Sequence, residues 1–161
     1  MLAFLSWFEE SALGAAVRGA GVWAYGVINL FHILGVATLF GAVLVLDLRL
    51  LGCWRRVPLS LIARPTVPLA AIGFCLAALS GLCLLSTNAT EYVGNPFLLI
   101  KFAAIALGLL NIVVLSRFDA WRQREAREPT DRESSVLAVA GGVSLASWLI
   151  AVSAGRLIGY W

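Results

Sequence analysis

One uninterrupted apolar stretch decides the fold: WAYGVINLFHILGVATLFGAVLVL, residues 23–46. None of its side chains is charged at neutral pH, and it closes on Asp47 and Arg49. About 20 apolar residues, at a helical rise of about 1.5 Å per residue, cross the hydrocarbon core of a bilayer. The stretch therefore predicts a transmembrane helix. It also holds the only histidine of the chain, His32, and an ionisable side chain inside such a helix is by default a candidate functional residue.

The composition of the whole chain indicates an integral membrane protein. Hydrophobic residues make up 61% and charged residues 13% of its 161 residues, against about 45–50% and about 25% in soluble domains. The net charge of +3 comes largely from arginines that flank apolar segments, which is the pattern of membrane orientation, so we expect contact with lipid and no nucleic-acid partner. The three cysteines have no CxxC spacing, which supports neither a disulfide framework nor a zinc site.

Four apolar segments predict an all-α bundle of four transmembrane helices that forms a single domain over residues 1–161. The expected spans are approximately residues 23–47, 68–86, 97–116 and 136–158. Prolines and arginines predict a loop at 48–68, and a second loop rich in arginine is expected at 117–134. Because lysine and arginine accumulate in cytoplasmic loops, both termini are expected on the outer side of the membrane.

The first 20 residues are too short and too charged to span a membrane. Leu2, Phe4, Trp7 and Phe8 give an apolar, aromatic beginning that Glu9, Glu10 and Arg18 interrupt. Such a segment is typical of a short helix that lies in the membrane interface with its aromatic side chains in lipid. A flexible terminus is the alternative interpretation.

Each span carries a stripe of small or polar residues at alternating steps of three and four, the spacing of one helix face. The stripes are Tyr25, Ile28, His32, Gly35, Leu39 and Ala42; Ala70, Gly73, Ala77, Ser80, Leu84 and Thr87; Lys101, Ala104, Gly108, Asn111 and Leu115; and Ala140, Ser144, Ser147, Ala151 and Ala154. Small residues allow membrane helices to approach closely, so these faces are expected to meet inside the bundle.

The depth of His32 suggests a binding site near the outer side. The imidazole lies nine residues from Trp23, or about 13 Å at helical rise, at the level of small residues on the other spans. Lys101 and Arg156 are the basic residues near the outer ends of their helices. Imidazole is an iron ligand, and lysine and arginine neutralise carboxylates, so a flat apolar molecule with acidic groups would fit this arrangement. Haem b has that shape.

Several motifs resemble a bacterial family of small four-helix membrane proteins of unknown function. They are Asn29-Leu30-Phe31-His32-Ile33-Leu34-Gly35, Asp47-Leu48-Arg49-Leu50-Leu51-Gly52, Asn95-Pro96-Phe97 with Lys101 and Asn111, and Gly155-Arg156-Leu157-Ile158-Gly159-Tyr160. More distantly, the chain resembles copper-resistance D-type membrane domains and the four-helix haem-binding protoporphyrinogen oxidase of bacteria. The resemblance implies a bacterial inner-membrane protein, with His32 as the haem ligand and Lys101 in the cofactor pocket. With the motifs added, the candidate cofactor-binding residues are His32, Lys101, Arg156, Asn29 and Gly35, and His32 is the candidate metal ligand.

Other interpretations of these residues stay open. Copper transport would use several soft or imidazole ligands, but the chain has one histidine and one methionine. A haem would have to be five-coordinate, take a sixth ligand other than histidine, or lie between two subunits of the homo-oligomer that we expect. His32 would instead bond Ser80 or Ser147 in a purely structural role, and Lys101 and Arg156 would only extend to the interface.

Three functions follow from these interpretations. The first is a b-type haem protein that transfers electrons or oxidises a small lipophilic substrate such as a quinone or a porphyrin-like molecule. The second is a transporter or channel for a proton or small solute. The third is a non-catalytic accessory subunit of a membrane complex.

Overall fold

The computed structural model describes residues 2–161, and within that range the chain is helical and has no strand. Its elements are α1 (Leu2–Glu9), α2 (Ala12–Gly19), α3 (Gly21–Leu50), α4 (Leu59–Thr87), η1 (Ala89–Tyr92), α5 (Pro96–Leu115), α6 (Asp119–Arg122), α7 (Asp131–Leu157) and η2 (Ile158–Tyr160). Four of them, α3, α4, α5 and α7 with its extension η2, are long and apolar enough to cross a membrane. The chain is therefore a multi-pass membrane protein built as a four-helix bundle, which confirms the predicted fold class.

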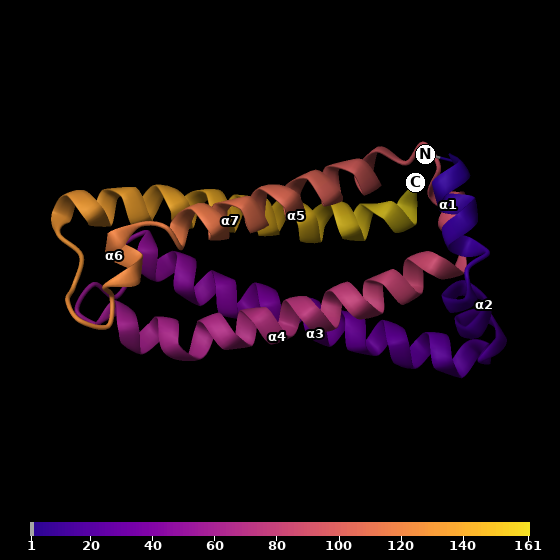
Figure 1. Ribbon diagram of the computed structural model, residues 1–161, viewed down its shortest axis with the longest axis horizontal. Helices are drawn as coiled ribbons and strands as arrows, with labels where there is room; N and C mark the ends of the chain where they lie inside the picture. Colours follow the sequence, from indigo (N-terminus) through magenta and orange to yellow (C-terminus); the bar gives the residue numbers. More distant parts are fainter. Residues whose placement is uncertain (1) are drawn as a thin grey trace.

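The bundle is elongated and has two different ends (Figure 1). One end carries both chain termini together with α1 and α2, and we call it the terminal end. The opposite end carries the connections 51–58 and 116–130, and we call it the arginine end because residues of these connections and of the adjoining helix turns hold most of the basic side chains. Helix α3 pairs with α4, and α5 pairs with α7, while α3 and α7 join the two pairs.

The faces predicted from the sequence pattern do meet inside the bundle. The buried members of the stripes are Gly35, Leu39, Ala42, Gly73, Ala77, Ser80, Thr87, Ala104, Gly108, Leu115, Ala140, Ser144, Ser147, Ala151 and Ala154. Asn111 joins two helices, because its Nδ2 donates to the carbonyl oxygen of Ala140 at 3.0 Å. Toward the terminal end the stripes are covered unequally: Tyr25 is exposed and His32 and Lys101 are partly covered, whereas Thr87 and Ala154 are buried.

Two apolar clusters fill the core. The first lies toward the arginine end and is made of Leu50, Leu59, Leu115, Ala120, Leu137 and Ala140. The second surrounds Trp148, which is 3% exposed and packs with Leu39 and Val43. The ring of Phe74 meets the indole edge-on, with 6.0 Å between ring centroids. Trp148 therefore fills the middle of the bundle, and the half of the bundle nearer the termini lies beyond it.

Helix α4 begins nine residues earlier than the predicted span, at Leu59, so the loop predicted for 48–68 is too long. Pro65 and Pro68 lie inside the helix, and both are exposed on its outer surface. The backbone N–H of Leu59 donates to the carboxylate of Glu128 at 3.1 Å, which starts the helix before the two prolines. Prolines are tolerated in membrane helices where other groups satisfy the freed backbone atoms. The early start of α4 was not predicted, because the local sequence does not show that a carboxylate from a distant loop binds its first N–H group.

The N-terminal segment forms two short helices where a single interfacial helix was expected, and Met1 lies outside the described residues. The hydroxyl of Ser11 accepts a hydrogen bond from the backbone N–H of Gly14 and so caps the start of α2. Trp7 is 65% exposed, and Phe4 stacks on Phe8 with 6.4 Å between ring centroids. The exposed aromatic surface is consistent with a segment that lies against lipid.

Candidate functional site

His32 is attached to the neighbouring helix α4 through one nitrogen of its ring. Nδ1 lies 2.9 Å from the carbonyl oxygen of Ala77 and 3.2 Å from the hydroxyl oxygen of Ser80. The Ser80 hydroxyl already donates its proton to the carbonyl oxygen of Leu76, at 2.5 Å. Both partners of Nδ1 therefore accept, which places the ring proton on Nδ1. In the neutral imidazole Nε2 then carries the free lone pair.

The second ring nitrogen is available for a ligand. Nε2 of His32 has no hydrogen-bond partner among the described residues. Histidines that bind metals usually donate their other N–H to a backbone carbonyl or a carboxylate, which fixes both the tautomer and the ring orientation. The hydrogen bond from Nδ1 to the Ala77 carbonyl oxygen gives His32 this arrangement. The imidazole is therefore prepared either to ligate a metal centre or to accept a proton.

Gly81 provides the space that the imidazole occupies. A methyl group built on Gly81 would lie 2.9 Å from Cε1 of His32 and 3.3 Å from Nδ1. The ring thus lies directly against the α4 backbone, and no larger residue fits at position 81 without moving it. Gly81 is not among the residues predicted from the sequence. Its position four residues after Ala77 puts both residues on the same face of a helix, but this becomes informative only once the contact of that face with His32 is known.

Lys101 enters the same half of the bundle from the opposite helix pair. Its side chain is half-buried and lies beside Gly155 of α7, where an added methyl group would be 3.6 Å from Nζ. Lys101 has no ion-pair partner within residues 2–161. A cation that is held partly out of water without an anion is suited to a ligand with an acidic group.

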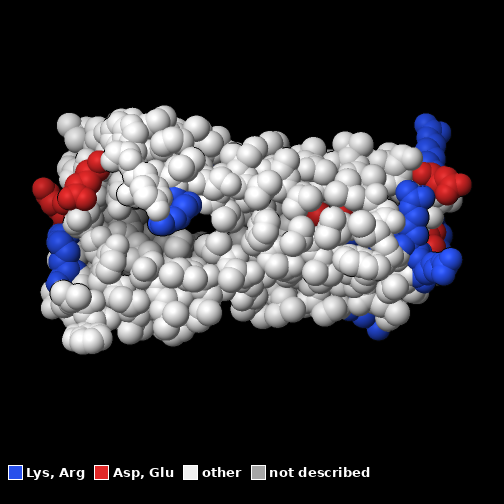
Figure 2. Space-filling view, turned by 180° about the vertical axis from the view of Figure 1, so that it is seen from behind, with Lys and Arg blue, Asp and Glu red and all other residues white. Residues whose placement is uncertain are grey.

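A hollow separates the two helix pairs in this half of the molecule. Figure 2 shows it toward the terminal end, with a basic side chain at its edge and uncharged residues around it. His32 belongs to the α3 and α4 pair and Lys101 to the α5 and α7 pair. Two of the predicted site residues therefore lie on different helix pairs, both in the half of the bundle nearer the terminal end.

The other three predicted residues occupy different surroundings. Arg156 is exposed, with its guanidinium 4.7 Å from the ring centroid of Tyr160 and hydrogen-bonded to the Tyr160 hydroxyl. Asn29 is exposed on α3. Gly35 is buried where α3 meets α4, because a methyl group there would lie 2.6 Å from the backbone nitrogen of Ala77. The position of Gly35 is that of a helix-packing residue.

Two polar contacts fix the short helices over the terminal end. One carboxylate oxygen of Glu9 accepts from the backbone N–H of Thr90 at 2.8 Å and from its hydroxyl at 2.7 Å. These hydrogen bonds hold the pKa of the Glu9 carboxyl below its usual value. Arg18 donates to the carbonyl oxygens of Glu9, Ser86 and Thr87, at 2.9, 3.2 and 3.2 Å. Helices α1 and α2 are thereby joined to the ends of α4 and η1.

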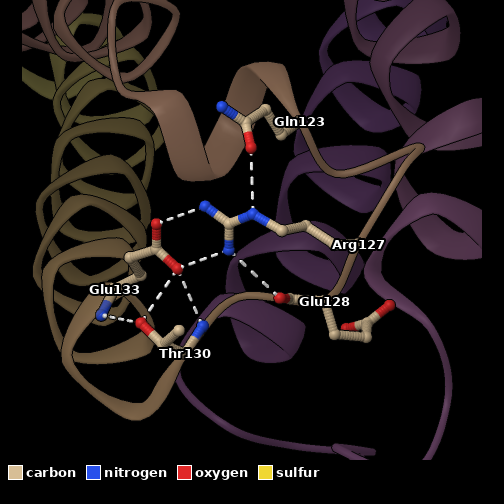
Figure 3. Close-up of polar contacts among 5 residues, drawn as sticks. All are labelled: Gln123, Arg127, Glu128, Thr130 and Glu133. Carbon is tan, nitrogen blue, oxygen red and sulfur yellow. Dashed lines mark hydrogen bonds and ion pairs between the residues drawn. The ribbon is translucent and has the colours of Figure 1, made fainter.

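Charged groups at the arginine end form a structural network. Arg127 binds both oxygens of Glu133, at 2.8 and 2.7 Å, and donates to the side-chain oxygen of Gln123 at 2.9 Å (Figure 3). Glu133 also accepts from the backbone N–H of Thr130 at 2.8 Å. The network shapes the connection that presents Glu128 to Leu59 and Arg49. Arg49 therefore pairs with Glu128, and it is remote from His32.

No group of three or more histidine, cysteine, aspartate or glutamate side chains within residues 2–161 is arranged to hold a metal ion. Haem differs in this respect, because its iron takes a single axial side chain from a helix. Fold and site together define a multi-pass helical membrane protein with one histidine beside a partly buried lysine. Comparisons of the chain with protein-family models, curated proteins and solved structures found no match.

Proposed function

We propose that the protein binds a b-type haem through Nε2 of His32, in the hollow between the two helix pairs, and acts in electron transfer or in the oxidation of a small lipophilic substrate. The observation that carries the proposal is the hydrogen bond from Nδ1 to the carbonyl oxygen of Ala77, at 2.9 Å. It leaves Nε2 as the free ligand nitrogen and holds the ring in place. When bound, the haem iron supplies one-electron chemistry.

The residues around His32 fit this cofactor in three respects. The imidazole is anchored, the opposite helix pair carries a lysine without an ion-pair partner among the described residues, and the helices that hold both residues are apolar. Lys101 would neutralise an acidic group of the bound molecule. A quinone or a porphyrin-like substrate could reach the same hollow from the lipid. With one histidine in the chain, further iron ligation has to come from another residue type or from a second subunit.

The purely structural interpretation of His32 has support in the same contacts. Nδ1 joins α3 to α4 through Ala77 and Ser80, which is what a helix-bridging histidine would do. The two interpretations differ at Nε2, which takes no part in the bridge. A measurement that detects a ligand at Nε2, and does not depend on helix packing, therefore distinguishes the two interpretations of His32.

The test is an absorption spectrum of the purified protein in detergent, before and after dithionite, with His32→Ala in parallel. We expect a Soret band with reduced α and β bands in the wild type, and their loss in the variant. Lys101→Gln should weaken haem retention. Arg122→Gln is the matched basic control, because Arg122 is exposed at the arginine end, and it should retain haem as the wild type does. A wild type that stays colourless after haem supplementation would overturn the proposal and favour an accessory or transport role.

We further propose that the protein lies in a bacterial inner membrane with its terminal end outside, as a homo-oligomer. Nine of the twelve basic residues support this orientation, since they lie near the arginine end: Arg49, Arg55, Arg56, Arg64, Arg117, Arg122, Arg124, Arg127 and Arg132. Cys53 is exposed in the connection 51–58. In intact spheroplasts, a membrane-impermeant maleimide should spare Cys53 and label a Gly159→Cys variant that lacks the native cysteines. The reverse pattern would invert the orientation.

A further inference from the structure

Asp47 is a buried carboxyl group inside the bundle, on the side of Trp148 away from His32. It is 2% exposed and is the only acidic residue buried to this extent in the described part of the chain. Ser144 of α7 is also buried, at 7% exposed, and lies three residues, about one helical turn, from Gly141, whose added methyl group would be 3.1 Å from the Asp47 carbonyl oxygen. Oδ2 has no hydrogen-bond partner among the described residues. Fifteen residues separate Asp47 from His32 along α3, or about 22 Å at helical rise, so the two groups belong to different sites.

The polar side chains nearest Asp47 along the chain and on α5 form hydrogen bonds or ion pairs with other groups. On its own helix, Arg49 donates to the carbonyl oxygen of Val57 at 2.9 Å and pairs with Glu128 at 3.4 Å. From α5, Asn111 donates its amide to the carbonyl oxygen of Ala140.

Helix α4 also offers no free donor at this level. The Thr66 hydroxyl donates to the carbonyl oxygen of Ile62 at 2.7 Å, and Arg64 is paired with Glu125 at 2.7 Å. Helix α7 also packs on Asp47, since a methyl group on Gly141 would lie 3.1 Å from the Asp47 carbonyl oxygen. Around this level α7 carries the buried Ser144 and no cation.

We propose that Asp47 and Ser144 form a proton-binding site inside the membrane bundle, loaded from the arginine end. A buried carboxylate without a cation is strongly disfavoured in an apolar surrounding, and binding one proton removes the charge. The protonated group has one donor and one acceptor oxygen, which a single serine can accommodate. A metal cation would instead need several oxygen ligands, and Ser144 is the one side chain that the site offers.

A polar pocket lies directly beneath this site. It has a volume of about 200 Å³ and is lined by Arg49, Leu50, Glu128, Ser134 and Leu137, among others. Leu50 also touches the α7 backbone at Gly141, where an added methyl group would be 2.9 Å from its Cβ. Leu50 and Leu137 both line the pocket and belong to the buried apolar cluster at this end of the bundle. Movement of these side chains would let a proton pass between the pocket and the carboxyl group.

The proposed proton site does not depend on haem binding, and its test does not use the visible absorption of haem. Infrared spectra of the purified protein at neutral pH should show the carbonyl stretch of a protonated carboxylic acid. Asp47→Asn should remove that band, and Ser144→Ala should shift it because one hydrogen bond is lost. Glu10→Gln, which alters an exposed acid, should leave it unchanged.

The pH dependence of the unfolding temperature is a second test, because it also shows whether each variant is folded. If the native state holds a proton that the unfolded chain has lost, stability falls as the pH rises. The unfolding temperature of the wild type should decline toward alkaline pH more steeply than that of Asp47→Asn. An infrared spectrum without a protonated carboxyl band, or a band that survives in Asp47→Asn, would overturn the proposal. A band that disappears when sodium replaces choline in the buffer would identify a metal-cation site and equally refute it.

Discussion

Gly35 of α3 and Gly73 of α4 meet where their helices cross. A methyl group on Gly73 would lie 2.5 Å from the backbone nitrogen of Leu39 and 2.9 Å from the carbonyl oxygen of Gly35. These neighbours are backbone atoms, which cannot turn aside as a flexible side chain can. The close approach holds the two helices in the register that also places His32 beside Ala77 and Ser80.

We therefore expect Gly73→Ala to separate the two helices and to lower the free energy of unfolding by about 1–3 kcal/mol, the usual cost of overpacking. Gly41→Ala is the matched control, because a methyl group at Gly41 meets nothing within 4 Å. Thermal unfolding in detergent, followed by circular dichroism, measures both. Equal stability of the two variants would contradict the close crossing.

The connection at the arginine end should contribute to stability through one carboxylate. Glu128 accepts from the backbone N–H of Leu59 at 3.1 Å and pairs with Arg49, whose side chain is 9% exposed. Glu128→Ala leaves both donors without this partner. Hydrogen bonds to charged groups contribute about 1.5–3 kcal/mol. Because the Glu128 side chain is 50% exposed and water screens it, we expect a loss toward the lower end of that range in the free energy of unfolding.

Glu125 in the same connection provides the comparison. Its pair with Arg64 is solvent-exposed, with 69% of the Arg64 side chain and 43% of the Glu125 side chain accessible, and the Arg64 hydrogen bond holds the pKa of Glu125 below its usual value. Exposed pairs contribute little because water screens them. Chemical unfolding of Glu125→Ala should therefore match the wild type. If it falls as far as Glu128→Ala, the buried partner Arg49 and the bond to the α4 backbone are not what distinguish Glu128 from Glu125.

The helical faces are predictable from sequence, whereas contacts between distant segments are not. The step of three and four residues identifies the buried positions Gly73, Ala77 and Ser80, because small side chains recur on the face that meets a neighbour. The same spacing, with the depth of His32, names Ser80 and Ser147 as alternative hydrogen-bond partners, and the structure shows the contact with Ser80. Helix periodicity carries no information on a carboxylate that arrives from a loop, so the start of α4 at Leu59 is not predictable from the local pattern.

For the candidate site, depth along the helices is the useful signal. His32 and Lys101 are expected at the outer side of the bundle, and the structure puts them on opposite helix pairs of one half of it. Gly81 is not recognisable from sequence, because a glycine in an apolar helix has no distinguishing pattern until its neighbour is known. Gly35 is a candidate through its motif, yet its surroundings are those of a helix crossing.

The contact between Glu9 and Thr90 should make the position of α1 depend on pH. Hydrogen bonds from Thr90 stabilise the charged carboxylate, so the folded pKa of Glu9 lies below the unfolded one. The stabilisation is complete above the unfolded pKa, about 4.3, and is lost as the pH falls through the folded value. We expect α1 to detach in that acidic range while the transmembrane helices stay folded.

Hydrogen exchange measured by mass spectrometry on peptides from residues 2–19 follows this detachment. Glu9→Gln should show the faster exchange already at neutral pH, since the amide that replaces the carboxylate is a weaker acceptor. Glu10→Gln changes the neighbouring acid, which is exposed, and should behave as the wild type. Uniform exchange in all three proteins would show that this contact does not hold α1.

The ring proton of His32 can be observed directly, because the chain has one histidine. With nitrogen-15 histidine and a purification tag free of histidine, the two ring nitrogens give a single pair of signals. We expect the neutral ring to be protonated at Nδ1, since Ala77 and Ser80 both accept there. Ser80→Ala should keep this tautomer through the remaining bond to Ala77. Gly81→Ala should lose it, because a methyl group 2.9 Å from Cε1 displaces the ring from its carbonyl partner.

Gly26→Ala controls for the general effect of a new methyl group on a membrane helix, since nothing lies within 4 Å of that position on α3. Its spectrum should match that of the wild type. A ring protonated at Nε2 in the wild type would remove the free lone pair on which the proposed ligand role of His32 depends, whether or not the protein is coloured. Protonation at Nδ1 that persists in Gly81→Ala would show that hydrogen bonding alone, without the close packing against α4, is enough to orient the imidazole.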